Sequence, residues 1–559
     1  MKSPATHLDA IIIGAGFSGL YHLLWLCDRL GLNVNVLETA GDLGGTWYWN
    51  RYPGARCDSE SHSYCYFFSK ELLEEWTWSE RYPEPPEILR YLHHVADKFD
   101  LKRDIRFDTR VVSAQFDEAA NRWRVETASG ERFEAAWLIT AVGCLSAANV
   151  PDIPGLGEFK GRWYHTGQWP REGVNFAGRR VGQIGTGSTG IQAAPVIAQS
   201  AKHLTVFQRT ANYSVPARNA PLNKAFLDYV RTNHEEIKAI VRSTPNGHPF
   251  RISPVKVFDV GPEERQKIYE AAWTKGGLQF RGSFYDLVLD KKANDTAAEF
   301  IKRKTREIVK DPQTAEILAD IDHPYAAKRP PIDTDYFETF NRDNVTLVNL
   351  RADPIERITP DGIRTRDNHY PLDIIVFATG FDAMTGPPMR MDSRGRDGLP
   401  LREAWRAGPV TYLGLQAPGF PNLFMITGPG SPSGLCNMVV PIEQHAEWIT
   451  DCIAWMRSNG IDRCEVEPEA AERWVRHVNE AANATVLSLA KHSWYHGANV
   501  PGKPQVFMPY AGGMVRYRAI CDDVAAKGYE GFIMRRGGVA RRTALNDFAA
   551  AEKISSPGV

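Results

Sequence analysis

The sequence has no long run of apolar residues, no closely paired cysteines and almost no net charge. Its apolar run near the N-terminus is only a few residues long and ends in glycines, so we expect neither a signal peptide nor a membrane span. A formal net charge of -1 creates no overall field that would attract nucleic acid or an anionic membrane. We expect small-molecule partners, with the chain acting as a monomer or a loose homo-oligomer.

The eight cysteines are scattered, and none of them forms a CxxC pair. This spacing excludes a zinc knuckle and the dithiol redox centre that disulfide reductases need. We therefore expect no metal site, and a reducing, cytoplasmic setting. The cysteines stand at positions 27, 57, 65, 144, 436, 452, 464 and 521.

What the chain does contain is two copies of a strand, glycine turn, helix and strand. In the first copy, an apolar strand at 9–13 precedes Gly14-x-Gly16-x-x-Gly19, and the second strand ends at Glu38. Such glycines allow a tight turn, a close approach of a pyrophosphate and close helix–strand packing, and the carboxylate suits ribose hydroxyls. The alternative interpretation is a purely structural glycine turn.

The second copy begins with the strand 180–184 and differs from the first at the end of its second strand. There Arg209 stands where an acid would bind the ribose of NAD. A guanidinium binds a 2′-phosphate that a carboxylate would repel, so we predict a preference for NADPH over NADH. The alternative is a surface arginine on an NAD site. The turn residues are Gly185, Thr186, Gly187, Ser188 and Gly190.

Two such units in 559 residues predict an α/β protein with two Rossmann-like dinucleotide-binding domains, and by analogy the first holds FAD and the second NADP. The segments 138–143 and 377–380 each end an apolar strand in a glycine and resemble crossings between domains. Residues 219–325 are rich in charge and helix formers, which indicates a helical insertion. The predicted bounds are 1–145 and 381–535 for the FAD domain, 146–215 and 329–380 for the NADP domain, 216–328 for the insertion and 536–559 for a flexible tail.

Further local patterns predict a helix at 87–101 and two strands within 121–142 around a turn at Ser129-Gly130. Additional strands are expected at 345–350 and 374–378.

Four segments carry a family resemblance. Residues 159–170 (FKGRWYHTGQWP) match the fingerprint FxGxxxHTxxWP of type I Baeyer–Villiger monooxygenases, and residues 44–58 (GGTWYWNRYPGARCD) match that family's second signature. The segments 328–345 and 493–504 also resemble the family. The resemblance spans residues 9 to about 534, and the loop 428–438 (GPGSPSGLCNM) is most similar to those of phenylacetone and steroid monooxygenases.

The resemblance implies an enzyme that uses FAD, NADPH and O2 to convert ketones into esters or lactones through a C4a-peroxyflavin, and it allows sulfide oxidation as a side activity. One alternative is a flavin-containing N- or S-oxygenase, which shares the glycine motifs but lacks the ending Trp169-Pro170. A flavoprotein that only binds nucleotides is the other alternative, and it would be expected to lose Arg329, Asp58 or a glycine motif.

By its position in the family, Arg329 would stabilise negative charge on the peroxide and on the ketone adduct, and Asp58 would hold and tune it. A structural ion pair is the plain alternative. Lys328 would join Arg209 around the 2′-phosphate, or be a solvated lysine. Trp494 would cover the nicotinamide–ribose region, or be a core residue.

Trp47 and Tyr64 would pack beside the flavin, although core packing explains Tyr64 equally well. His165 lies in the fingerprint, where we expect it to couple NADP binding to domain closure rather than to act as a base. The residues predicted to bind FAD are Gly14, Gly16, Gly19, Glu38, Thr46, Trp47, Asp58, Tyr64, Val111 and Met438. Those predicted to bind NADP are Gly185, Thr186, Gly187, Ser188, Gly190, Arg209, Lys328 and Trp494.

Overall fold

The computed structural model describes residues 4–536 and 539–541, and its largest sheet has eight strands. Seven of them run in the order β17-β4-β5-β6-β1-β2-β3, and β18 pairs with β6. The last four residues of β1 are all buried, as expected for a central strand covered on both faces. The strands are β1 (Thr6–Ile13), β2 (Val34–Leu37), β3 (Ile105–Arg106), β4 (Val111–Asp117), β5 (Arg122–Thr127), β6 (Arg132–Thr140), β17 (Asp392–Arg394) and β18 (Leu423–Met425).

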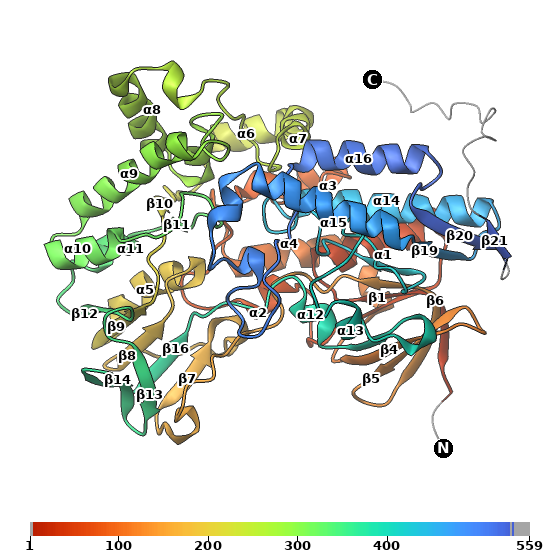
Figure 1. Cartoon of the computed structure of the whole chain (residues 1–559), viewed down its shortest axis with the longest axis horizontal. Helices are drawn as coiled ribbons and strands as arrows, with labels where there is room; N and C mark the ends of the chain where they lie inside the picture. Colours follow the sequence, from red (N-terminus) through yellow and green to blue (C-terminus); the bar gives the residue numbers. More distant parts are fainter. Residues whose placement is uncertain (1–3, 537–538, 542–559) are drawn as a thin grey trace.

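Helices from both ends of the chain accompany this sheet. Helix α1 (Phe17–Leu30) follows β1 and packs against α14 (Val439–Ser458). Figure 1 shows α14, α15 (Pro468–Asn483) and α16 (Met514–Ala526) together on one side of the sheet. Shorter helices complete this part: α2 (Thr46–Trp49), α3 (Lys70–Glu75), α4 (Pro85–Lys98), α12 (Gly386–Met389) and α13 (Leu401–Ala404).

The second sheet has five strands in the order β12-β9-β8-β16-β7, and every neighbouring pair is parallel. Helix α5 (Ser188–Ser200) follows β8, just as α1 follows β1. The chain therefore folds as two Rossmann-like α/β units. The strands are β7 (Arg162–His165), β8 (Arg180–Ile184), β9 (His203–Gln208), β12 (Val345–Asn349) and β16 (Ile374–Phe377), beside an antiparallel sheet of β13 (Ile355–Thr359), β14 (Gly362–Thr365) and β15 (His369–Pro371).

A largely helical segment lies between β9 and β12, and Figure 1 shows it in yellow and green at the upper left. It has a hydrophobic core of its own that includes Trp273, Phe280 and Tyr325. The parallel pair β10 (Val215–Pro216) and β11 (Ile332–Asp333) joins its two ends. Its helices are α6 (Lys224–Thr232), α7 (His234–Ser243), α8 (Pro262–Lys275), α9 (Lys291–Ile308) and α10 (Pro312–Ala319), and α11 (Tyr336–Thr339) follows β11.

The chain crosses between the two large sheets twice, after β6 and after β16. The crossings lie side by side, because the Asn149 N–H donates to the Gly380 carbonyl at 3.1 Å and the Asp382 N–H donates to the Ala147 carbonyl at 2.8 Å. The strands of the second sheet thus lie, in sequence, between two groups of strands of the first.

The local predictions agree with these elements to within a few residues. The helix predicted at 87–101 is α4, and the two strands predicted within 121–142 are β5 and β6. In the predicted C-terminal tail, Arg536 ends β20 (Phe532–Arg536) and 539–541 form β21 (Val539–Arg541). Strand β20 pairs with β21 on one side and with β19 (Arg463–Val466) on the other. The other residues predicted for the tail lie outside the described residues.

Candidate active site

The first glycine turn leaves the N-terminus of α1 open. A Cβ added at Gly19 would lie 1.9 Å from the Gly14 carbonyl oxygen, so the turn and the helix touch backbone to backbone. Gly16 precedes α1 without a side-chain cap, and a Cβ there would meet only the backbone of Gly45 at 3.4 Å. Free helix N–H groups beside two glycines form a cradle suited to a pyrophosphate.

Glu38 lies beside this cradle, at the end of β2. Its carboxylate accepts from the N–H of Ala15 at 2.6 Å and from that of Ala40 at 2.8 Å. Burial raises the pKa of Glu38, and these donors oppose the rise. The Thr109 N–H donates to the Glu38 carbonyl at 2.8 Å, and Val111 starts β4 two residues later as a buried side chain.

Trp47 and Tyr64 contact each other directly. The Trp47 Nε1–H donates to Tyr64 Oη at 3.1 Å, and the two rings meet edge to face with centroids 5.8 Å apart. Thr46 is the exposed first residue of α2. Met438 directly precedes α14, and its Sδ accepts from the Gly434 N–H at 3.2 Å.

The second glycine turn repeats the geometry of the first. A Cβ at Gly190 would lie 2.2 Å from the Gly185 carbonyl oxygen, whereas a Cβ at Gly187 would meet nothing within 4 Å in the part of the chain that the structure describes. Gly187 precedes α5 without a side-chain cap, and Ser188 is the exposed first residue of that helix. The Thr186 hydroxyl donates to a backbone carbonyl at 2.9 Å. The open space before α5 again suits a pyrophosphate.

Three cationic side chains lie close enough to interact electrostatically: Arg209, Lys328 and Arg351. Burial lowers the pKa of Lys328; Asp322 opposes this effect, and the two arginines add to it. Arg351 forms an ion pair with Asp322, and Arg209 is exposed. Such a cluster suits a phosphate.

Arg329 and Asp58 form a two-pronged ion pair. The Arg329 Nε–H donates to Asp58 Oδ2 at 2.5 Å, and Nη2–H donates to Oδ1 at 2.8 Å. The Nη1–H groups donate to the carbonyls of Gly434 at 3.1 Å and Cys436 at 3.2 Å. Burial disfavours both charges, but the partners outweigh it, so the pKa of Asp58 is lowered and that of Arg329 is raised. Both groups are therefore ionised at neutral pH.

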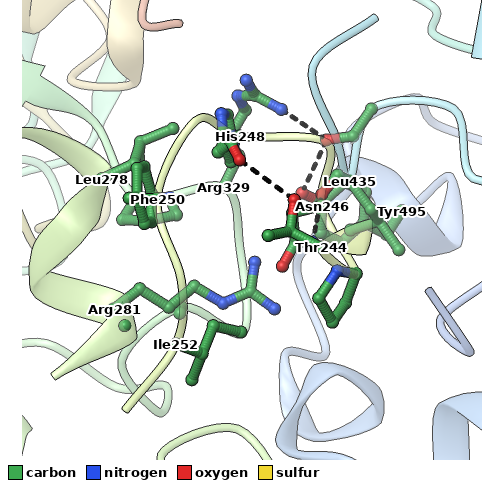
Figure 2. A pocket seen from close by; sticks show the side chains of 15 residues that line it. Thr244, Asn246, His248, Phe250, Ile252, Leu278, Arg281, Arg329, Leu435 and Tyr495 are labelled. Carbon is green, nitrogen blue, oxygen red and sulfur yellow. Dashed lines mark hydrogen bonds between the residues drawn. The ribbon is translucent and has the colours of Figure 1, made fainter. Parts of the chain in front are cut away.

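Arg329 lines a cavity of about 550 Å³, which includes its open mouth. Figure 2 shows side chains from the helical segment and from the loop around Leu435 converging on this space. Phe250, Ile252 and Leu278 provide apolar walls.

Trp494 and His165 contact different parts of the structure. The Trp494 ring packs against Gly434, whose carbonyl accepts from Arg329. His165 is buried, its Nδ1 accepts from the Gly167 N–H at 3.0 Å, and its ring meets Phe381 of the second crossing edge to face. His165 therefore contacts the connection between the sheets rather than the cavity lining.

The structure thus brings together several residues selected from the sequence and adds others. Arg329 and Asp58 form an ion pair although 271 positions separate them in the sequence, and Lys328 lies near Arg209. Sequence reasoning missed Arg281 and Arg351. Arg351 could have been found, because it follows β12 as Arg209 follows β9. The two strands are parallel neighbours, with Asn349 opposite Gln208, so both arginines lie at the same edge of the sheet. Arg281 carries no local signal.

No helix in the described part of the chain is long and apolar enough to cross a membrane. Across residues 4–536 and 539–541, no group of three or more His, Cys, Asp and Glu side chains could hold a metal ion.

Comparison with known proteins identifies the family. Residues 9–219 match the family model described as FMO-like, flavin-binding monooxygenase-like. A Baeyer–Villiger monooxygenase from Pseudooceanicola batsensis is 46% identical over 96% of this chain and 98% of its own length. A phenazine N-monooxygenase from Lysobacter antibioticus is 43% identical over 95% of this chain and 97% of its own. The solved structure of an oxidized steroid monooxygenase bound to NADP is 49% identical, has a TM-score of 0.90, and covers 95% of this chain and 100% of that one.

Because the Baeyer–Villiger monooxygenase and the steroid monooxygenase match nearly the whole chain at 46% and 49% identity, the chain belongs to the flavin-dependent Baeyer–Villiger monooxygenases, which use FAD, NADPH and O2 to convert ketones into esters or lactones.

Proposed function

We propose that Arg329 supplies the fixed positive charge for oxygen insertion beside a ketone carbonyl, and that Asp58 holds it in position. The observation that carries this proposal is the set of four hydrogen bonds that anchor Arg329 on the cavity wall. A guanidinium has five N–H groups, so one Nη2–H remains after these four contacts. That donor suits an oxygen that gains negative charge during the reaction.

FAD, when bound and reduced by NADPH, supplies the activation of O2. The chain's own contribution is electrostatic. When the carbonyl carbon is attacked, its oxygen gains negative charge, and a donor already in place needs no reorganisation to stabilise it. The partly buried setting of Arg329 strengthens this interaction relative to water.

The two cofactors would be held by the two glycine turns. The cradle at Gly16 and Gly45 suits the FAD pyrophosphate. The Glu38 carboxylate has lone pairs that its backbone donors do not use, and these can accept hydrogen bonds from ribose hydroxyls. For NADPH, the open N-terminus of α5 suits the pyrophosphate, and Arg209 with Lys328 suits the 2′-phosphate.

We propose aryl or bulky ketones as well as cyclic ones as substrates. The loop 428–438, which resembles that of phenylacetone-type enzymes, contributes Gly434 and Leu435 to the cavity. A ketone panel, with NADPH consumption and product mass as readouts, tests the range. Reaction with small cyclic ketones only would contradict it.

N-oxidation is the second candidate activity, because one relative of 43% identity is a phenazine N-monooxygenase. Product mass alone does not separate N-oxide from ester, because each gains one oxygen. Offering a heteroaromatic amine and a ketone separately does separate them. Efficient turnover of the amine with no reaction of any ketone would favour this second candidate.

We further propose that the enzyme works in the cytoplasm, as a monomer or a loose homo-oligomer. The support for this location is that all eight cysteines are free, as in a reducing compartment. Size-exclusion chromatography with light scattering tests the assembly state.

The role of Arg329 is tested by Arg329→Ala. Loss of one preorganised electrostatic partner costs on the order of 2.7–4 kcal/mol, or roughly a hundred- to a thousandfold in the insertion step. The variant should still bind FAD and consume NADPH, with the electrons released as hydrogen peroxide. Arg329→Lys should fail almost as badly, because a lysine cannot form the two-pronged contact with Asp58.

The measurement is stopped-flow absorbance of the flavin together with product analysis by mass. Ester formation by Arg329→Ala at nearly the wild-type rate would refute the assigned role. A variant that cannot be reduced at all would assign Arg329 to the hydride step instead.

A further inference from the structure

Arg281 is a second guanidinium on the wall of the same cavity, and it lacks the partners that Arg329 has. Within residues 4–536 and 539–541, it forms no hydrogen bond and no ion pair. Its electrostatic neighbours are Tyr495, Tyr325, Arg329 and His248, none of them a carboxylate. Figure 2 shows its guanidinium pointing into the space between the labelled side chains, without a dashed line to it.

The position of Arg281 is set by its chain neighbours. Phe280 is fully buried in the core of the helical segment, and Gly282 is buried. A Cβ at Gly282 would lie within 3.7 Å of Phe250 and Ile252. With the backbone packed on both sides, the arginine side chain faces the cavity as part of the fold.

The charge of Arg281 is not balanced by other groups of the cavity. Burial lowers its pKa, but an arginine keeps its proton at neutral pH. Asp58 already pairs with Arg329. Burial lowers the pKa of His248 to about 3, and the two arginines contribute, so this imidazole is neutral. The cavity therefore has an excess of one positive charge.

Three other polar side chains of the wall already have hydrogen-bond partners, and the neutral His248 ring stacks on Phe250. Asn246 donates to the Leu435 carbonyl at 2.7 Å, Thr244 donates to the His248 carbonyl at 3.0 Å, and Tyr495 donates to the Gly434 carbonyl at 3.3 Å. These side chains shape the cavity without needing a ligand. An unpaired cation in a partly buried site is costly, and an anion that enters the cavity would reduce that cost.

We propose that Arg281 binds the carboxylate of a keto acid, so that the preferred substrate carries its anion at Arg281 and its ketone carbonyl at Arg329. A guanidinium and a carboxylate match in a planar, two-pronged pair, and the apolar wall suits the hydrocarbon between the two groups. This inference rests on the proposed function, because it assumes that the ketone is attacked beside Arg329.

The test uses the FAD-loaded enzyme with NADPH and a series of cyclohexanones. Each bears a carboxylic acid on a tether of one to four methylenes, and each is compared with its methyl ester. For the tether that spans the two arginines, kcat/KM should favour the acid about ten- to a hundredfold, mainly through KM. In the absence of NADPH, the same acid should raise the melting temperature more than its ester does.

Variants assign the selectivity to one side chain. Arg281→Gln should bring the ratio of acid to ester, measured in the same variant, close to one, and Arg281→Lys should keep part of the preference because it keeps the charge. Arg251→Gln, at an exposed arginine in the same segment, is the matched control and should keep the wild-type ratio.

The outcomes separate the two proposals. If ketones are converted but acid and ester react equally at every tether length, this inference is wrong and the proposed function stands. If Arg281→Gln or Arg281→Lys weakens NADPH binding and leaves the acid preference intact, Arg281 serves the cofactor and the inference is again wrong. If no ketone of either kind is converted, the proposed function itself fails.

Discussion

Two arginines on one cavity wall differ in their partners, and this difference argues for different roles. Arg329 is held by Asp58 and two carbonyls, so its charge is fixed whether or not a ligand is bound. Such a group suits charge that develops during a reaction. Arg281 has no protein partner in the described part of the chain, so it suits charge that the ligand brings with it.

Arg209 determines the choice between NADPH and NADH if it contacts the 2′-phosphate. A charge-assisted contact of this kind contributes about 1.5–3 kcal/mol, or roughly ten- to a hundredfold in affinity. Arg209→Ala should lose this factor in kcat/KM with NADPH and leave the value with NADH nearly unchanged. NADH is the internal control in steady-state kinetics. Equal losses with both cofactors would make Arg209 a structural residue.

Asp333 should make stability depend on pH. Burial raises its pKa to about 7, and it accepts from Ser214 Oγ at 2.5 Å and from the Tyr336 N–H at 3.3 Å. In an unfolded chain an aspartate has a pKa of about 3.9. Between these pKa values the Asp333 carboxyl is deprotonated in the unfolded chain and protonated in the folded chain. The free energy of unfolding therefore falls as pH rises from about 4 to 7.

Asp333→Asn should remove this dependence, because an amide can donate to Ser214 and still accept from the Tyr336 N–H. The melting temperature of the variant should rise relative to wild type from pH 5 to pH 8, as calorimetry can measure. An equal rise in Asp335→Asn, at an exposed neighbour, would show that the effect does not come from Asp333.

In the turn before α5, two glycines only three positions apart should respond to substitution in different ways. At Gly190 a Cβ would lie 2.2 Å from the Gly185 carbonyl oxygen, so Gly190→Ala should lower the melting temperature. At Gly187 a Cβ meets no atom of the described residues within 4 Å and φ is -81°, so Gly187→Ala should fold normally. It should nevertheless raise KM for NADPH, because the methyl group occupies the space of the pyrophosphate.

Thermal unfolding and NADPH kinetics on both variants check this contrast. If Gly187→Ala binds NADPH normally, the pyrophosphate does not approach this turn.

The elements that were predictable from sequence are those with local causes. The strand, glycine turn and helix of each nucleotide unit rest on residues within about thirty positions, and β1, α1, β8 and α5 all form where expected. Turn residues at Ser129-Gly130 likewise marked the hairpin of β5 and β6.

The rest depends on contacts between distant segments. The pairing of Arg329 with Asp58 was expected only from the family resemblance, since 271 positions separate the two residues. Nothing near Arg281 in the sequence distinguishes it from other arginines. It lines the cavity because the helical segment packs Phe280 into a core whose members are far apart in the chain.

The two large sheets are connected where their nucleotide turns lie. A Cβ at Gly14 would lie 2.7 Å from the carbonyl of Ala141, and one at Gly185 would lie 2.4 Å from the carbonyl of Ala378. Ala141 and Ala378 are the first residues after β6 and β16, where the crossings begin. A movement of either turn on nucleotide binding would therefore press directly on a crossing.

The crossings in turn contact the segment that carries Trp494. The Asn499 side chain donates to the Phe381 carbonyl at 2.7 Å, and Lys503 pairs with Asp382 at 2.6 Å. Trp494 of the same segment packs against Gly434, next to Arg329. A continuous path of contacts thus runs from the NADP turn through the second crossing to the cavity wall.

Substitution of His165 provides a test of this coupling. It ends β7 beside Phe377, contacts Phe381 across the second crossing, and has a pKa lowered by burial, so it is neutral at pH 7. His165→Ala should loosen the crossing, raise KM for NADPH and increase the hydrogen peroxide released per NADPH consumed. His165→Asn, which can still accept from the Gly167 N–H, should show a smaller change.

The readout is the ratio of ester formed to NADPH consumed, measured beside the melting temperature. His369→Ala, at a partly exposed histidine on β15 of the same unit, is the matched control. A fall in melting temperature without a change in that ratio would make His165 a packing residue only. A lower ratio at an unchanged melting temperature, absent in His369→Ala, is expected if the crossing transmits NADP binding to the cavity, because productive oxygen transfer then requires the two units to close together.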